Sequence, residues 1–176
     1  ACCLPIAPSI AKIDSEKISG AVAIDQQAAL RVSQAVVGKT IGDHILFDRE
    51  GKAVRFSQYR GKPLLVNFVY TGCTQVCPAS TRFLGRAIQQ AQATLGADKF
   101  QVLTIGFNLP YDTPSAMREF ARRHAIDFAG WEFLSPSPKA LPQLIKELGF
   151  AFASTPKGFD HLTQVTIVDA QGKVFR

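Results

Sequence analysis

From about residue 42 onward, short apolar runs alternate with stretches in which apolar residues recur every three or four positions. The clearest run covers residues 64–70 and is bounded by turn-forming residues, which is typical of a central strand buried on both faces. The clearest helical stripe begins at Phe83 and stops before Gly96. Strand-like apolar runs that alternate with helix-like stripes predict an α/β fold.

The other elements follow from the same two patterns. Residues 44–48 and 53–56 predict an N-terminal β-hairpin, with Gly51 in its turn. Pro78 is expected to begin the helix that carries the stripe, and Thr113 to cap a helix over residues 114–124. Another helix is expected at residues 140–148, and strands at 100–107, 131–134, 162–169 and 173–175.

A strand, a cysteine-bearing loop and a helix, with a hairpin at the end, favour a thioredoxin-like fold with a central mixed sheet flanked by helices. We expect residues 37–176 to form this domain and residues 1–36 to form an N-terminal arm or linker, because their apolar pattern is weak. A short helix is expected within residues 19–37. The chain stops inside the predicted terminal hairpin, so we expect this chain to lack the final helix of such a domain.

Composition suits one globular domain, since 47% of the 176 residues are hydrophobic and 19% are charged. The longest apolar runs are far shorter than the roughly 20 residues of a membrane span. We therefore expect membrane association only through an anchor outside this chain. The net charge of +6 comes from scattered basic residues. Their distribution predicts no nucleic-acid binding and is compatible with an acidic protein partner.

The four cysteines form two pairs, of which Cys73 and Cys77 are the stronger candidates for function. They are expected between a buried strand and a helix N-terminus, where unpaired N–H groups and the helix dipole stabilise a thiolate. Three residues separate them, instead of the two in a thioredoxin-type redox pair. The wider spacing suits two sulfurs on one metal, although a disulfide or a purely structural pair stays open. Cys2 and Cys3 are expected to have no function; a shortened lipid-attachment signal and a thiol pair are the alternatives.

His161 is the candidate third ligand, because it precedes a predicted strand whose leading loop lies beside the cysteine loop in thioredoxin-like sheets. Two thiolates and one imidazole form a soft site that suits Cu(I), or Cu(II) with a further weak ligand. Zinc usually completes a tetrahedron, for which the sequence offers no clear fourth ligand. His44 and His124 are expected to be structural; His124 ends a predicted helix, where an imidazolium suits the dipole.

Three segments together resemble the Sco/SenC family. The cysteine motif with a downstream histidine is the specific signal, and the similarity runs from about residue 37 to the end, loosely over residues 128–157. The segments are residues 61–73 followed by Cys77 and Pro78, residues 112–114 (Asp-Thr-Pro), and Asp160 and His161 followed by a strand and residues 169–172.

The resemblance implies that Cys73, Cys77 and His161 bind copper, as Cu(I) or Cu(II), with Asn108 and Asp112 in the surrounding shell. It also implies a copper metallochaperone that builds the dinuclear copper centre of cytochrome c oxidase subunit II, or serves another copper protein, with another copper chaperone as a further partner. The implied location is periplasmic, facing out from the bacterial inner membrane, with the mitochondrial intermembrane space as the alternative.

Two positions depart from the family pattern, because Asn108 and Tyr111 stand where it usually has an acidic residue and an arginine. Partner docking or redox tuning is therefore expected to differ. Two other functions remain open: a thiol-disulfide oxidoreductase that acts on cysteines of a copper protein, and a copper or redox sensor. A peroxidase fits less well, because the Pro and Thr that usually precede a peroxidatic cysteine are not spaced that way here.

Overall fold

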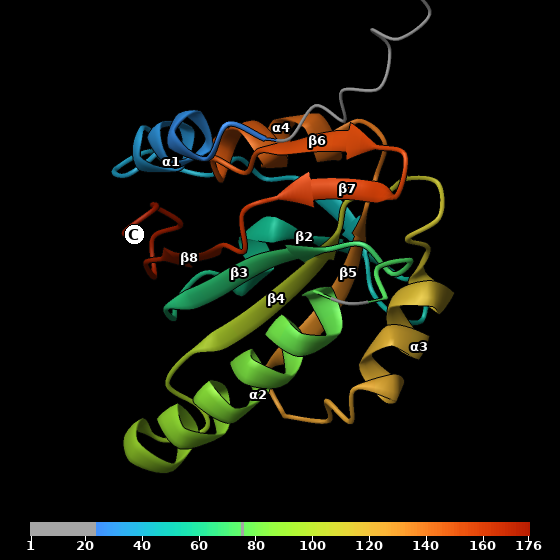
Figure 1. Ribbon diagram of the computed structural model, residues 1–176. Coiled ribbons are helices and arrows are strands. Elements are labelled where there is room, and N and C mark those ends of the chain that lie inside the picture. Colours follow the sequence, from blue (N-terminus) through green and yellow to red (C-terminus); the bar gives the residue numbers. More distant parts are fainter. Residues whose placement is uncertain (1–23, 75) are drawn as a thin grey trace, which may run out of the picture.

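The computed structural model describes residues 24–74 and 76–176. Its centre is a six-stranded sheet in the order β2-β1-β5-β4-β3-β8, accompanied by a separate two-stranded hairpin, β6-β7 (Figure 1). The strands are β1 Ile45–Phe47, β2 Ala53–Arg55, β3 Leu64–Val69, β4 Gln101–Gly106, β5 Trp131–Pro136, β6 Phe152–Thr155, β7 Gly158–His161 and β8 Val165–Val168. The α-helices are α1 Gln26–Gln34, α2 Val76–Leu95, α3 Pro114–Arg123 and α4 Ala140–Glu147.

Three parallel strands form the middle of the sheet. β3 pairs with β4 from Leu64↔Gln101 to Val69↔Gly106, and β4 pairs with β5 on its other side. β8 joins β3 and β1 joins β5 in antiparallel fashion, so the sheet is mixed. The residues of β4 after Gln101 are buried on both faces of the sheet, in agreement with its largely apolar sequence. The predicted α/β architecture, thioredoxin-like with an N-terminal hairpin, is confirmed.

Helices cover both faces of the sheet (Figure 1). α2 links β3 to β4 and α3 links β4 to β5, and right-handed crossovers in the same direction place both helices on one face. α1, α4 and the β6-β7 hairpin lie on the other face (Figure 1). Aromatic packing holds the hairpin against this face of the sheet. The ring of Phe68 in β3 stacks on that of Phe150, just before β6, with centroids 4.5 Å apart.

The expected short helix near the N-terminus is α1, which packs against the rest of the molecule. Asp25 caps it by accepting a hydrogen bond from the Ala28 N–H, and Ala29 is buried. Just before it, the Ile24 N–H donates to the Asp160 carboxylate on β7 over 2.9 Å. Cys2 and Cys3 lie outside the described residues, and the division of the chain at residue 37 stays a prediction.

The sequence interpretation was wrong about two local features beside the cysteines and the histidine. α2 begins at Val76, so Cys77 lies in the helix and Pro78 is its third residue. The segment interpreted as a loop before the last strand contains the β6-β7 hairpin, closed by a tight turn between Thr155 and Gly158. Its Ser, Pro and Gly content resembles a loop, and each strand has only four residues. His161 therefore ends β7, and the next strand begins at Val165 rather than Leu162.

A close backbone approach at Gly106 brings the loop before α3 onto the end of β4. A Cβ at this position would lie 2.6 Å from the Asp112 Cβ and 3.0 Å from the Met117 Sδ. Both of those residues are completely buried, so neither neighbour can move into solvent. The absence of a side chain at residue 106 therefore allows Asp112 to reach the cysteine loop.

We predict that Gly106→Ala lowers the free energy of unfolding by about 1–3 kcal/mol, because the added methyl group overpacks a buried contact. Urea unfolding followed by circular dichroism measures this. Gly72→Ala is the matched control, since its Cβ would meet only the Tyr70 ring at 3.8 Å. Equal losses in the two variants would contradict the steric explanation.

Candidate metal centre

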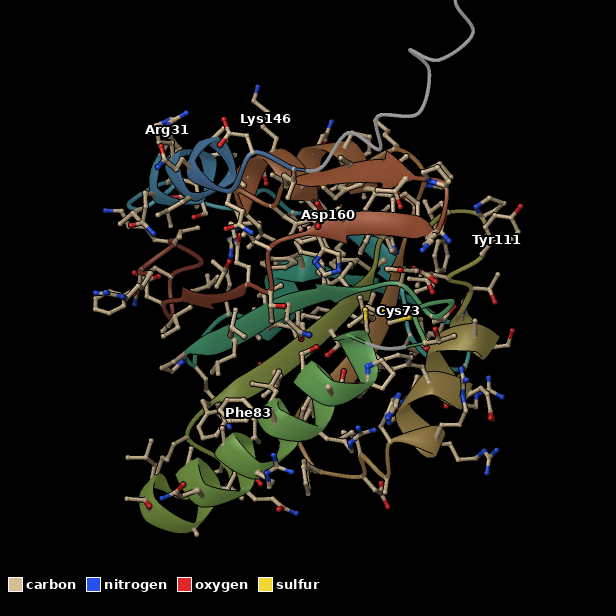
Figure 2. The ribbon with its side chains drawn as sticks, viewed as in Figure 1. Arg31, Cys73, Phe83, Tyr111, Lys146 and Asp160 are labelled. Carbon is tan, nitrogen blue, oxygen red and sulfur yellow. The ribbon has the colours of Figure 1, made fainter. Side chains whose placement is uncertain are left out.

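Cys73 and Cys77 lie together where β3 ends and α2 begins. Cys73 is half-buried in the loop, whereas Cys77 is buried in the first turn of the helix. The Cys77 N–H donates to the Cys73 Sγ over 3.2 Å. This N–H is one of those that a first helical turn leaves without a backbone partner. The expected contact between a cysteine sulfur and the helix N-terminus is therefore present for Cys73 (Figure 2).

Burial controls the protonation of Cys77. It raises the pKa of the Cys77 thiol to about 12, and the neighbouring Cys73 side chain acts in the same direction. Desolvation penalises the thiolate more than the helix N-terminus favours it. The expectation that the helix stabilises both thiolates is wrong for Cys77, which is a neutral thiol at pH 7 in the metal-free protein.

The carboxylate of Asp112 ties together the two loops at this end of the sheet. Its Oδ1 accepts hydrogen bonds from the Thr71 N–H at 2.8 Å and the Thr71 hydroxyl at 2.7 Å. Its Oδ2 accepts from the Asn108 N–H at 2.8 Å. Burial raises the pKa of Asp112, while these hydrogen bonds oppose that rise. Asp112 thus fixes the backbone two residues before Cys73, and Asn108 takes part through its own backbone.

Tyr70 contacts both the cysteine loop and the hairpin. Its carbonyl oxygen accepts the Cys73 N–H at 3.1 Å, and burial, with the Cys73 side chain nearby, raises the pKa of Tyr70. Its ring meets Phe159 edge-on at 5.2 Å and His161 at 6.3 Å between centroids. In the sequence, Tyr70 is simply the last residue of a predicted strand. The one available signal was a hydroxyl-bearing ring at the end of an otherwise apolar run.

His161 presents one ring nitrogen for a ligand. Its Nδ1 lies 3.0 Å from the Leu162 carbonyl oxygen, and a carbonyl can only accept, so Nδ1 carries the proton. The Nε2 of the neutral ring therefore keeps its lone pair, the arrangement common among metal-binding histidines. The ring packs against Phe107 and Phe150, each at 5.6 Å between centroids. It also borders a pocket of about 200 Å³ beside α2.

The structure brings the two cysteines together, and Tyr70 contacts Cys73 through its backbone carbonyl and His161 through its ring. Within residues 24–74 and 76–176, no three metal-binding side chains converge on one point. The three-ligand set therefore stays a prediction. Tyr111, at the position where the family pattern has an arginine, is 71% exposed and points outward from the loop before α3 (Figure 2).

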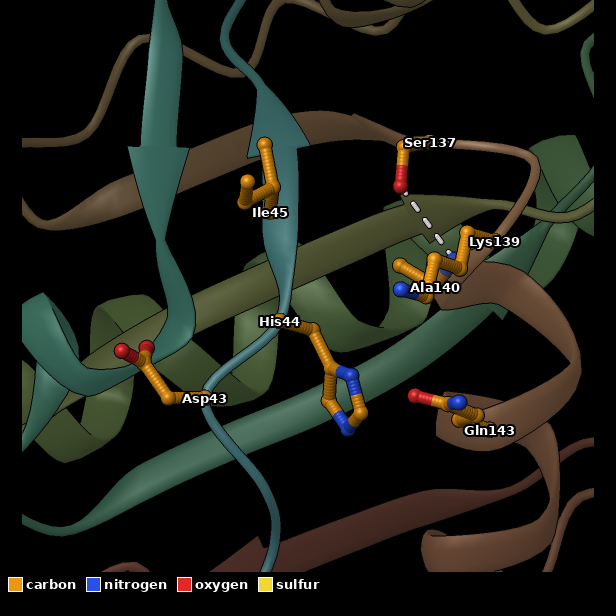
Figure 3. Close-up of a pocket in the computed structure, with 7 residues that line it drawn as sticks. All are labelled: Asp43, His44, Ile45, Ser137, Lys139, Ala140 and Gln143. Carbon is orange, nitrogen blue, oxygen red and sulfur yellow. Dashed lines mark hydrogen bonds between the residues drawn. The ribbon is translucent and has the colours of Figure 1, made fainter.

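The other two histidines belong to the packing of the fold. The His44 Nε2 lies 2.7 Å from the Glu147 Oε2, and the ring lines a pocket of about 360 Å³ between β1 and α4 (Figure 3). No cysteine lines this pocket. Burial, with Arg82 and Arg123 nearby, lowers the pKa of His124. The imidazolium expected at the end of α3 is therefore disfavoured, because burial and positive neighbours oppose the helix dipole.

The family model for SCO1/SenC matches residues 33–176. The chain belongs to the SCO1/SenC family. Its curated relatives include a SCO1 protein homolog of Bacillus subtilis, 26% identical over 135 residues that cover 73% of this chain and 68% of the relative. The mitochondrial SCO2 homolog of Homo sapiens is 29% identical over 77% of this chain. The chain spans about half, 49%, of that mitochondrial relative.

Solved structures of Sco proteins share the fold. Copper-bound ScoI of Bradyrhizobium japonicum is 26% identical, with a TM-score of 0.62 over 77% of this chain and 86% of its own. A SCO1/SenC family lipoprotein of Bacillus anthracis is 19% identical, with a TM-score of 0.69 over 79% and 83%. BsSco, described as having a disulfide switch and as a member of the Sco family of cytochrome c oxidase assembly proteins, is 20% identical, with a TM-score of 0.66 over 78% and 81%. Among the described residues of this Sco protein, no helix has the length and apolar character needed to cross a membrane.

We predict that iodoacetamide modifies Cys73 before Cys77 in the reduced, metal-free protein at pH 7. Cys77 is buried and its pKa is raised to about 12, so its thiolate is scarce. Below that pKa, the thiolate fraction of Cys77 grows about tenfold per pH unit, and its initial rate should rise with pH accordingly. Peptide-level mass spectrometry at low conversion separates the two sites. Equal rates at pH 7 would contradict the assignment.

Proposed function

We propose that this Sco protein is a copper metallochaperone that helps to assemble the dinuclear copper centre of cytochrome c oxidase. The proposal rests on two neighbouring cysteines at a loop–helix junction, where the Cys77 N–H donates to the Cys73 Sγ, in a member of the SCO1/SenC family. A related Sco protein, 26% identical, has a structure with copper bound. Thiolates are soft ligands and suit Cu(I), while a nearby imidazole and a further weak ligand extend such a site to Cu(II).

The proposed ligands are Cys73, Cys77 and His161, with Asp112 and the Asn108 backbone supporting the cysteine loop. The His161 Nε2 fits this role because its Nδ1 proton is engaged by a carbonyl. Cys77 must lose its proton to become a ligand, so copper binding releases that proton to solvent. Affinity for copper is therefore expected to rise with pH.

Release of the metal to a partner requires a ligand that the partner can reach. Cys73 is half-exposed, whereas Cys77 is buried, so Cys73 is the ligand that an incoming thiol of the partner meets first. The proposed partners are cytochrome c oxidase subunit II or another copper protein, and a second copper chaperone that supplies the ion. We place the protein in the periplasm on a membrane anchor, a location supported by the lipoprotein among its structural relatives.

A second candidate function is thiol-disulfide exchange, favoured by the contrast between half-exposed Cys73 and buried Cys77. In this reaction the Cys73 thiolate attacks a partner disulfide, forming a mixed disulfide and releasing one partner thiolate. Cys77, once deprotonated, attacks the Cys73 sulfur and releases the second partner thiolate. Two electrons pass to the partner, and a Cys73–Cys77 disulfide remains for an external dithiol reductant to reduce. A sensor would use the same two cysteine states to signal to a regulatory protein.

We predict that the fully reduced protein binds one equivalent of Cu(I) tightly in competition with a chromophoric Cu(I) chelator. Joint replacement of Cys73→Ser and Cys77→Ser should abolish this binding, because it removes both soft ligands. His161→Ala should weaken affinity strongly, by at least about tenfold, with unchanged circular dichroism. His124→Gln is the control, since His124 lies at the end of α3 and contacts Phe120 rather than the cysteine loop.

Two results would overturn parts of this model. Unchanged copper affinity in His161→Ala would exclude the three-ligand site while leaving the cysteine pair. Absence of tight copper binding by the reduced parent would exclude the chaperone. Reduction of a disulfide substrate by the metal-free protein would then be the deciding assay for the exchange reaction.

A further inference from the structure

We propose that the arginines of α2 and α3 form a docking surface for an acidic protein and bring that protein to Cys73. The net charge of the chain is +6, and its basic residues are scattered along the sequence. In the folded protein, α2 and α3 together hold five arginines and one acidic residue, so this pair of helices carries most of the net charge. We call these five residues the arginine face: Arg82, Arg86, Arg118, Arg122 and Arg123.

Both helices begin at the edge of the sheet where the cysteines lie. β3 and β4 are parallel, so their carboxyl ends meet at one edge, and the chain enters α2 and α3 from there. Arg82 follows Cys77 on α2 at a distance of about 7.5 Å along the helix axis. The acidic residues next after the two helices, Asp98 and Asp127, come after the opposite helix ends. Positive charge is therefore placed beside the candidate metal centre.

Arginines from the two helices lie near one another. Gly85, shortly after Arg82, is buried where α2 packs on the segment that follows α3, and a Cβ there would lie 3.2 Å from the Ile126 Cδ1. The pKa of His124, at the end of α3, is lowered first by burial and then by Arg82 and Arg123. One arginine of each helix is thus close to the same ring. The charges form one continuous surface across the two helices.

The α2 half of the arginine face is available to a partner. Arg82 and Arg86 are exposed, and within the described part of the chain neither forms an ion pair. On α3, Arg122 and Arg123 share Glu119, at 2.8 Å and 3.6 Å. A guanidinium group binds a carboxylate through two parallel hydrogen bonds, so acidic side chains are the matching chemistry.

The position of Cys73 favours a protein over an anionic membrane as the occupant. Cys73 is half-exposed at the end of this surface, where an incoming thiol or disulfide meets it first. An acidic protein docked on the arginine face can present its own sulfur to Cys73, whereas a lipid surface offers none. Positive charge beside a reactive group raises the rate of encounter with negative partners, and salt suppresses the effect. That this partner is a copper protein rests on the proposed function; the attraction itself does not.

The first experiment uses the reduced, metal-free protein and two disulfide reagents. Dithiobis(nitrobenzoate) carries a carboxylate on each half, and dithiodipyridine is neutral at pH 7. With either reagent, the Cys73 thiolate attacks one sulfur, a mixed disulfide forms, and one reagent thiolate leaves and is measured by its absorbance. The ratio of the two initial rates cancels any change in the reactivity of the thiol, so it reports the attraction of negative charge.

We expect Arg82→Gln with Arg86→Gln to lower this ratio about two- to fivefold at about 0.01 M salt, and to have little effect at about 1 M. The matched control, Arg31→Gln with Lys146→Gln, removes the same charge from exposed side chains of α1 and α4 on the other face of the sheet (Figure 2). It should leave the ratio unchanged. Equal ratios in the two double variants would overturn the docking surface.

Two further probes distinguish a protein partner from a membrane. A glutamate-rich peptide with a pair of cysteines should take Cu(I) from the loaded protein faster at low salt than the same peptide with glutamine in place of glutamate. The double replacement of Arg82 and Arg86 should remove this advantage, and absence of the advantage in the parent would contradict the proposal. Sedimentation with vesicles of phosphatidylcholine and phosphatidylglycerol that is lost in the same variant would overturn the assignment to a protein.

The outcomes for this surface and for the proposed function are separable. If the parent bound no Cu(I), the metallochaperone function would fail. The rates with the two disulfide reagents would still decide whether the arginine face attracts acidic partners to Cys73.

Discussion

The geometry of the candidate site depends on one buried carboxylate. Asp112 is completely buried and receives three hydrogen bonds, two from Thr71 and one from the Asn108 backbone. Without them, the end of β3 and the loop before α3 would each leave polar groups unpaired in the interior. Gly106 gives the carboxylate the room to make these bonds. The cysteine loop is thus positioned by hydrogen bonds between its backbone and the Asp112 carboxylate, which does not itself contact the sulfurs.

The two cysteines, although adjacent, have different chemical roles. The Cys73 sulfur accepts an N–H from the helix, and Cys73 remains half-exposed. Cys77 is buried, and desolvation keeps it protonated at neutral pH. A pair of this kind can accept a soft cation with release of a proton, or react in two successive thiol exchanges. The same asymmetry therefore underlies both functions that the site supports.

The sequence was sufficient to predict the central sheet, because buried parallel strands such as β3 and β4 have short, largely apolar sequences bounded by turn-forming residues. It also identified the cysteine pair, since both residues sit close together at one loop–helix junction. It was insufficient for the β6-β7 hairpin, whose short strands contain turn-forming residues, and for the start of α2. Tyr70 was missed as part of the site because its ring contacts with Phe159 and His161 join residues that lie far apart in sequence. The distance between His161 and the two sulfurs depends on the tertiary structure, which the spacing of residues along the chain does not determine.

The hairpin that carries His161 is attached to the protein in a different way from the strands of the six-stranded sheet. β6 and β7 pair with each other in a sheet separate from the six-stranded one. Ring contacts dominate their attachment, including Phe107 with Phe152 at 5.0 Å and Phe107 with Phe159 at 5.2 Å. Dispersion contacts of this kind vary gradually with position, unlike the hydrogen bonds of a strand ladder. The position of the imidazole is therefore set by the packing of rings, among them Phe107 and Phe150, and not by a ladder shared with the main sheet.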